Sequence, residues 1–280
     1  MRWVLQLTDR TNTRINEPMP TRPRNYHRPE TLPEALQLLA QPDTAPLAGG
    51  TRLLAGDVRV GTVIDLQSLG LHSISRANDV LRIGATAKLT DIAESDEITG
   101  GAREVLLQAI RASGPNTYRN AATLGGIIGG REPSSELLAL LLTLDADLSL
   151  AHQDNTDTIS LSDYLHPEEK PAGLITDVVI PWAEGKGAIH RVARTPADQP
   201  IVAVAGWRAS KGQLRLAAVG ISTRPSPLLS VHETVTAVTI AAAVSTSQDI
   251  VNHPGDFLGS REYRREMVGV LVARVIEDCS

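Results

Sequence analysis

Cysteine is nearly absent from this chain of 280 residues, and its scarcity excludes several kinds of site. The one cysteine, Cys279, leaves no partner for an intrachain disulfide. It also leaves too few thiolates for an iron–sulfur cluster, which needs about four. The seven histidines are scattered, and no two stand at the spacing of a metal site. We therefore expect no metal centre held by this chain alone.

Long apolar runs and an excess of basic residues are also missing. The longest apolar stretch, 137–144, ends at Asp145 and is far shorter than the ~20 residues that span a bilayer. The formal net charge is −5, whereas a nucleic-acid surface needs clustered lysine and arginine. We therefore expect a cytoplasmic protein with no membrane span and no nucleic-acid partner.

The start of the chain is rich in arginine but lacks the apolar core of a targeting peptide, and it carries Asp9 and Glu17. We expect residues 1–20 to form a loose N-terminal extension, and Met19 is an alternative start. The length favours two domains after it.

Glycine is concentrated in two short segments, around Gly49-Gly50 and around Gly125-Gly126. Glycine permits positive φ and lets a ligand approach the backbone amides closely. Consecutive amides in such turns form an anion-binding concavity, and a nearby helix start adds partial positive charge. The two segments together predict a ligand with two phosphates, such as a dinucleotide.

Two common nucleotide motifs are absent. No P-loop sequence occurs, and neither glycine segment fits the strand–turn–helix setting of a Rossmann fingerprint. A single Gly-Gly pair is most often just a tight turn. Here one pair follows a predicted strand and the other leads towards a predicted helix, which favours a binding role over two unrelated turns.

Periodicity predicts a mixture of helices and strands, followed by a run of strands and two helices, which is typical of an α+β protein. We expect a ligand-binding domain at 21–166, divided near 75 into subdomains 21–75 and 76–166, and an α+β domain at 167–280. The expected helices are 31–41, 103–111, 133–144, 234–245 and 261–278. The expected strands are 45–48, 62–65, 80–83, 146–150, 174–181, 188–194, 201–209 and 213–220, with a linker at 167–173 and a turn at 224–227.

Several segments, in order, resemble the FAD-binding subunit of the molybdenum hydroxylases, the xanthine dehydrogenase and carbon monoxide dehydrogenase family. Each motif is loose alone, but the ordered set is specific and covers residues 20–280. The resemblance implies a two-part FAD-binding domain of the PCMH or vanillyl-alcohol-oxidase-like type, followed by a smaller α+β domain with a sheet and helices. The matching segments are 26–36, 48–54, 63–66, 81–86, 119–126, 144–146 and 175–181, with Arg194, Asp198 and Tyr263-Arg264.

The resemblance implies FAD as the cofactor and assigns residues to it. The first glycine segment would wrap the pyrophosphate, and the second would lie beside the flavin. Ser135 and Glu136 would offer an acceptor to a ribityl or ribose hydroxyl, although these residue types also fit a helix cap. The candidate residues are Ala48, Gly49, Gly50, Thr51, Arg52, Leu53, Leu54, Thr123, Leu124, Gly125, Gly126, Ser135, Glu136 and Ile175.

Three positions depart from the family pattern. Ile127 stands where the family has asparagine, Glu136 where it has aspartate, and His190 where it has lysine. The first change removes an amide near the flavin end, and the last removes a fixed cation, because histidine is mostly neutral at pH 7. Tyr118 is the nearest aromatic residue in a chain with only 3% aromatics. These departures indicate a redox site that is tuned differently or weakened.

The family implies an electron-transfer subunit rather than a complete enzyme. A large molybdopterin partner would oxidise the substrate, and a small [2Fe-2S] partner would pass electrons to FAD here. FAD would then reduce NAD+ or another acceptor. The cofactor supplies the chemistry, so we assign no acid, base or nucleophile to this chain. Two alternatives remain open: an assembly subunit with weakened or lost FAD binding, and a stand-alone FAD oxidoreductase.

Overall fold

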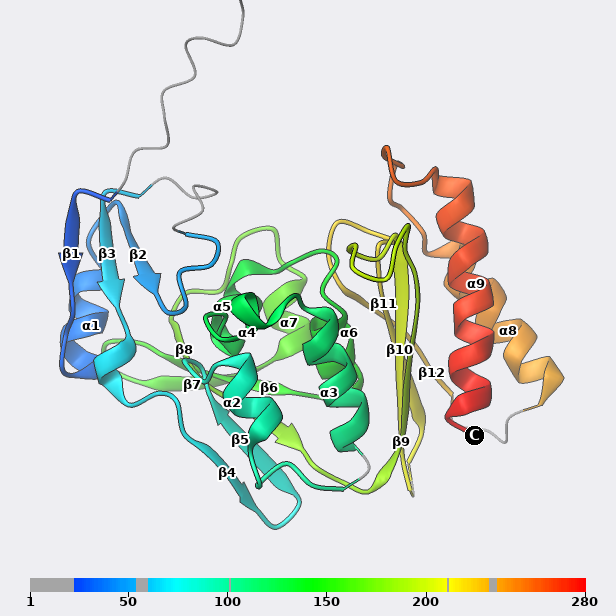
Figure 1. The fold of residues 1–280 in the computed structure, drawn as a ribbon, viewed down its shortest axis with the longest axis horizontal. Coiled ribbons are helices and arrows are strands. Elements are labelled where there is room, and N and C mark those ends of the chain that lie inside the picture. Colours follow the sequence, from blue (N-terminus) through cyan, green and yellow to red (C-terminus); the bar gives the residue numbers. More distant parts are fainter. Residues whose placement is uncertain (1–22, 54–59, 101, 211, 232–235) are drawn as a thin grey trace, which may run out of the picture.

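The computed structural model describes residues 23–53, 60–100, 102–210, 212–231 and 236–280, which form three sheets with helices between and beside them (Figure 1). The expected N-terminal extension, 1–20, lies outside these residues. Helices and strands are both abundant, as the α+β class requires. In the part of the chain that the structure describes, no helix is long and apolar enough to cross a membrane.

A small parallel sheet opens the described chain, with strand order β1-β3-β2. Helix α1 (Leu32–Leu39) forms the crossover between two of its parallel strands, and Thr31 caps the helix by accepting a hydrogen bond from the amide of Glu34. The first glycine segment follows β2 directly. The strands are β1 (Asn25–His27), β2 (Thr44–Leu47) and β3 (Thr62–Asp65), and the short 3-10 helix η1 (Gln67–Leu69) follows them.

A five-stranded antiparallel sheet, in the order β4-β5-β8-β6-β7, forms the centre of the molecule. Its middle strand, β8, pairs with both β5 and β6. The expected C-terminal domain, 167–280, had included this strand. We therefore place the proposed boundary between the two parts after Trp182 rather than at 167. The strands are β4 (Ile74–Ala77), β5 (Val80–Gly84), β6 (Asp147–Ala151), β7 (Thr156–Ser160) and β8 (Leu174–Pro181).

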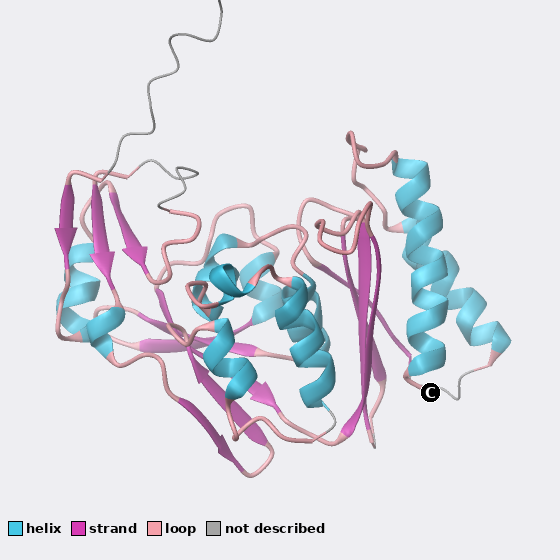
Figure 2. Ribbon diagram, viewed as in Figure 1, coloured by secondary structure: helices cyan, strands magenta, loops and turns pink. Residues whose placement is uncertain are grey.

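Helices fill the space between the central sheet and the C-terminal sheet (Figure 2). Helix α6 packs on β10 and β11, and α3 packs on β9. The apolar run of the sequence falls on α6, which is buried almost all round and so shows no polar face. The helices are α2 (Leu89–Glu94), α3 (Ala102–Ala112), α4 (Asn116–Arg119), α5 (Leu124–Gly130), α6 (Glu136–Thr143) and α7 (Leu161–Leu165).

The C-terminal part is an antiparallel sheet, β12-β11-β10-β9, with two helices on its outer face. Alternate residues of β10 enter two different cores: Ala203 and Ala205 face α6, whereas Val202 and Val204 face α9. The expected turn at 224–227 is wrong beyond Pro225, because the edge strand β12 begins there. The elements are β9 (Gly185–Val192), β10 (Val202–Ala209), β11 (Leu214–Val219), β12 (Ser226–Val231), α8 (Ala237–Asp249) and α9 (Arg261–Asp278).

Candidate functional site

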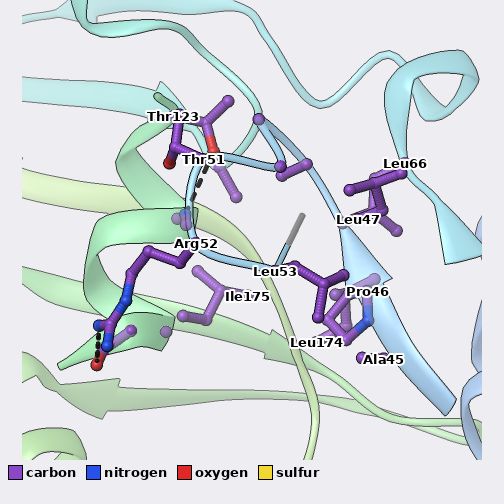
Figure 3. Close-up of a pocket in the computed structure, with 18 of the residues that line it drawn as sticks. Ala45, Pro46, Leu47, Thr51, Arg52, Leu53, Leu66, Thr123, Leu174 and Ile175 are labelled. Atoms are coloured by element: carbon purple, nitrogen blue, oxygen red, sulfur yellow. Dashed lines mark hydrogen bonds between the residues drawn. The ribbon is translucent and has the colours of Figure 1, made fainter. Parts of the chain in front are cut away.

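An elongated cleft lies between the first glycine segment and helix α5. It consists of a larger cavity of about 420 Å³ and a smaller one of about 230 Å³. The two cavities adjoin, since Thr51, Arg52 and Gly126 line both. Cavities in this size range are typical of small-molecule and cofactor sites. Figure 3 shows the larger cavity, with Leu47 and Leu53 on one wall and Ile175 on another.

The first glycine segment is held close to the chain that precedes α5. A Cβ atom on Gly49 would lie 2.0 Å from the carbonyl oxygen of Ala121, so only glycine fits there. Gly50 adopts a φ of 69°, in the left-handed region that glycine occupies without strain. The structure thus brings the two glycine segments together at one edge of the cleft.

The second glycine segment forms the start of helix α5 rather than the turn that the sequence predicted. Thr123 caps α5 by accepting a hydrogen bond from the amide of Gly126, at 3.2 Å. Leu124, Ile127 and Ile128 bury one side of the helix in the core, and this packing outweighs the low helix propensity of glycine. The opposite side is made of glycine alone and lines the larger cavity: Gly125, Gly126, Gly129 and Gly130.

The glycine side of α5 leaves the cleft open to a ligand. A Cβ atom on Gly129 would meet no protein atom within 4 Å, whereas one on Gly125 would lie 2.6 Å from the Cβ of Ala85. Gly125 therefore serves close packing on the central sheet, and Gly129 borders open space. A flat backbone surface of this kind lets a ligand approach the helix without meeting a side chain.

Positive charge gathers at the larger cavity. The guanidinium of Arg52 donates to the carbonyl oxygen of Gly130 at 2.8 Å and forms an ion pair with Glu132 at 3.2 Å. Lys170 also lines this cavity. Burial, followed by the positive charges of Arg131 and Arg52, lowers the pKa of Lys170. An anionic ligand would relieve this repulsion between like charges.

A buried carboxylate stands at the smaller cavity. Glu136 is 3% exposed and forms an ion pair with Arg191 across 3.2 Å. Burial raises the pKa of Glu136, and the charge of Arg191 opposes this rise. Arg191 also donates to the carbonyl oxygens of Pro196 and Asp198, in the loop that forms one wall of the cavity. Glu136 therefore helps to hold this wall through Arg191.

Removal of the Arg191 charge is expected to destabilise the protein in a pH-dependent way. Burial favours the protonated form of Glu136 in the folded protein. The contribution of Glu136 to folding stability is therefore most favourable at low pH, and it is lost as the pH rises through the raised pKa of this carboxyl group. An unpaired buried carboxylate costs about 3 kcal/mol. Arg191→Gln should therefore lower the free energy of unfolding by about that amount at pH 8 and by less at pH 5.

Chemical denaturation at the two pH values measures the effect. Arg265→Gln is the matched control, because Arg265 pairs with Asp249 on the exposed surface and such pairs add little. An equal loss for Arg191→Gln at both pH values would contradict the proposed coupling to Glu136.

The candidate residues fall in four groups. Ser135, the cap of α6, and Glu136 line the smaller cavity. Leu124 is 2% exposed and lines neither cavity, because its side chain faces the core. Leu54 lies outside the described residues. The remaining candidates line the larger cavity: Ala48, Gly49, Gly50, Thr51, Arg52, Leu53, Thr123, Gly125, Gly126 and Ile175.

Sequence reasoning missed several residues of the cleft. The pair Gly129-Gly130 follows the pair Gly125-Gly126 at a spacing of four, which places both pairs on one side of a helix. This spacing could have predicted a glycine-lined helix face. Lys170 and Gly173 carried no such signal within the expected linker. Among the three departures, Ile127 lines the smaller cavity beside Tyr118, but His190 lines neither and pairs with Asp278 at 2.7 Å.

Comparison with known proteins gives the family. The model for the FAD binding domain in molybdopterin dehydrogenase matches residues 20–183. The uncharacterized protein YgfM of Escherichia coli K12 is 30% identical, covering 91% of this chain and 95% of its own length. The glyceraldehyde dehydrogenase medium chain of Sulfolobus acidocaldarius is 28% identical, covering 91% of this chain and 97% of its own length.

The fold is also shared with a solved structure, that of the carbon monoxide dehydrogenase from Hydrogenophaga pseudoflava. The match has a TM-score of 0.85 at 20% identity and covers 92% of this chain and 97% of the other. It confirms the expected α+β fold, and the family model identifies this fold as an FAD-binding one. FAD, the cofactor implied by the sequence resemblance, is the cofactor of the matched family. The chain belongs to the family of FAD-binding domains of molybdopterin dehydrogenases.

Proposed function

We propose that this chain is the FAD-carrying electron-transfer subunit of a cytoplasmic, molybdopterin-dependent hydroxylase or dehydrogenase. A large molybdopterin chain would oxidise the substrate, and a small [2Fe-2S] chain would deliver the electrons. NAD+ or another acceptor would receive them. Relatives named as medium chains of a glyceraldehyde dehydrogenase and a carbon monoxide dehydrogenase support this division of labour. The observation that carries the proposal is the glycine-lined cleft on α5.

The residues of the cleft fit FAD. The cofactor is long and carries two phosphates, and the cleft is elongated, open along the glycine side of α5 and positively charged at one end. We propose that residues 48–53 hold the diphosphate through backbone amides and that Thr123, Gly125 and Gly126 lie towards the flavin. Ser135 and Glu136 would accept a hydrogen bond from a ribityl or ribose hydroxyl.

Bound FAD supplies the redox chemistry, because it accepts and returns one or two electrons. The residues of this chain bind the cofactor, orient it and shield it from water. Ile175, Leu47 and Leu53 contribute apolar walls to the larger cavity. Tyr118 is the aromatic side chain at the smaller cavity among the residues that the structure describes.

A flavin assay tests the proposal. The full chain, purified alone or with its partners, is expected to show a flavin absorbance spectrum and to release FAD when denatured. Protein that is colourless, and that takes up no FAD during reconstitution, would contradict the proposal. That result would favour a non-catalytic assembly subunit, for which the replacement of a polar residue by Ile127 at the smaller cavity is the supporting observation.

A further inference from the structure

We propose that Lys170 is an anion-binding residue that contacts the diphosphate of the cofactor, and that Arg131 and Arg224 position it. The two arginines hold the segment 164–170, which we call the strap, against the cleft. The inference rests on the proposed function and adds to it a cation from outside both glycine segments.

The strap is fixed on one side by Arg131. This side chain is 7% exposed, and its guanidinium lies 5.1 Å from the centre of the Tyr164 ring. It donates to the carbonyl oxygens of Tyr164 at 2.5 Å, Pro167 at 2.8 Å and Glu169 at 3.4 Å. Arg131 is also the residue that ends α5, with a φ of 49°. The glycine helix and the strap are therefore positioned by one residue.

The strap is fixed on the other side by Arg224, which comes from the C-terminal part, just before β12. Its guanidinium donates to the carbonyl oxygens of Leu165 at 3.1 Å, His166 at 2.6 Å and Glu168 at 3.4 Å, and also to that of Pro167. The carbonyl groups of residues 164–169 thus accept from Arg131, from Arg224 or, at Pro167, from both. Such pairing gives a defined position to the part of the strap that follows α7 and has no regular structure.

Lys170 follows directly from this fixed segment. It lines the larger cavity together with Pro171 and Gly173, as do Gly129, Gly130 and Arg52. Among the described residues no hydrogen bond or ion pair is formed by its ammonium group. The nearby carboxylate of Glu132 is already paired with Arg52. The cleft therefore contains uncompensated positive charge where a ligand can enter.

The electrostatics select the kind of ligand. Burial, and after it the positive charges of Arg131 and Arg52, disfavours the charged form of Lys170 and lowers its pKa. A diphosphate carries two negative charges and offers oxygens to several donors, so it would stabilise both cations that line the larger cavity, Lys170 and Arg52. A neutral ligand would leave the repulsion in place. The strap thus brings to the cleft a charge that complements the backbone amides of the first glycine segment.

Lys170→Met is the direct test, because Lys170 lines the open cleft, remains partly accessible to solvent and forms no hydrogen bond or ion pair among the described residues, so its loss should not disturb the fold. We expect the dissociation constant for FAD, titrated into the flavin-free full chain, to rise about tenfold, with a weaker dependence of affinity on salt. Lys170→Arg should restore most of the affinity. Lys186→Met removes the same charge from an exposed residue that lines neither cavity, and it should bind FAD as the unaltered protein does.

A double variant tests the positioning role. If Arg224 acts through Lys170, then Arg224→Met weakens FAD binding, but the double variant with Lys170→Met binds no more weakly than Lys170→Met alone. Additive losses would contradict that role. If the unaltered protein binds FAD and Lys170→Met binds it within twofold with the same salt dependence, the inference about Lys170 is wrong. If the unaltered protein binds no FAD, the proposed function itself is wrong.

Discussion

Gly129→Leu is expected to leave the protein folded and to weaken the binding of FAD strongly. The Cβ position of Gly129 borders open space in the larger cavity, so the new side chain meets no protein atom near its base. It would instead occupy the volume that we assign to the cofactor. Overpacking costs about 1–3 kcal/mol, so affinity should fall by on the order of 100-fold.

Gly129→Ala is the matched control for this variant. Glycine inside a helix is less favourable than alanine by roughly 0.5–1 kcal/mol, so the single methyl group should stabilise α5 slightly. Chemical denaturation and FAD titration, applied to both variants, separate the helix effect from the filling of the cleft. Unaltered FAD affinity in a folded Gly129→Leu protein would mean that the ligand does not lie on the glycine side of α5.

Gly49→Val is expected to separate the two glycine segments and so to disrupt the cleft. The added Cβ would lie 2.0 Å from the carbonyl oxygen of Ala121 and 3.2 Å from the Cα of Ala122. These are backbone atoms, which cannot move aside as a flexible side chain can. The first segment must shift, and we expect a loss of FAD affinity on the order of 100-fold, at about 1.4 kcal/mol for each factor of ten.

Gly70→Ala is the control for an effect of any glycine replacement in this part of the chain. Gly70 has a φ of 69°, but a Cβ atom there would meet nothing within 4 Å, and Gly70 lines neither cavity. The replacement should cost about 1–2 kcal/mol of stability, as a left-handed non-glycine residue does, and leave FAD affinity unchanged. Equal losses of affinity in both variants would show that the contact with Ala121 is not the cause.

Local signals in the sequence were sufficient to predict many helices and strands and the general location of the binding site. The strands at 62–65 and 174–181 and the helix at 261–278 have the predicted bounds, because their apolar patterns are long or are closed by glycine, proline or a cap. The two glycine segments also led directly to the cleft. In each case the deciding information lies within a few neighbouring residues.

Features that depend on contacts between residues far apart in the chain could not be predicted from the sequence. Strand β8 was predicted with its exact bounds, yet its place in the middle of the central sheet depends on pairing with β5 and β6. Helix α5 was missed because glycine disfavours helices in isolation, and only the burial of its apolar side explains it. Lys170 was missed because two arginines, one from each part of the chain, define its position.

The double burial of β10 has a consequence for anyone who wishes to isolate the flavin-binding portion. One side of that strand completes the core that also contains α6 and the central sheet, while the other side forms the core beneath α8 and α9. Residues 20–183, which the family model matches, therefore do not include the β10 residues that complete their hydrophobic core. Excised at that boundary, they would expose the leucines of α6 to water and be prone to self-association. The modular unit of this protein is larger than its cofactor-binding module.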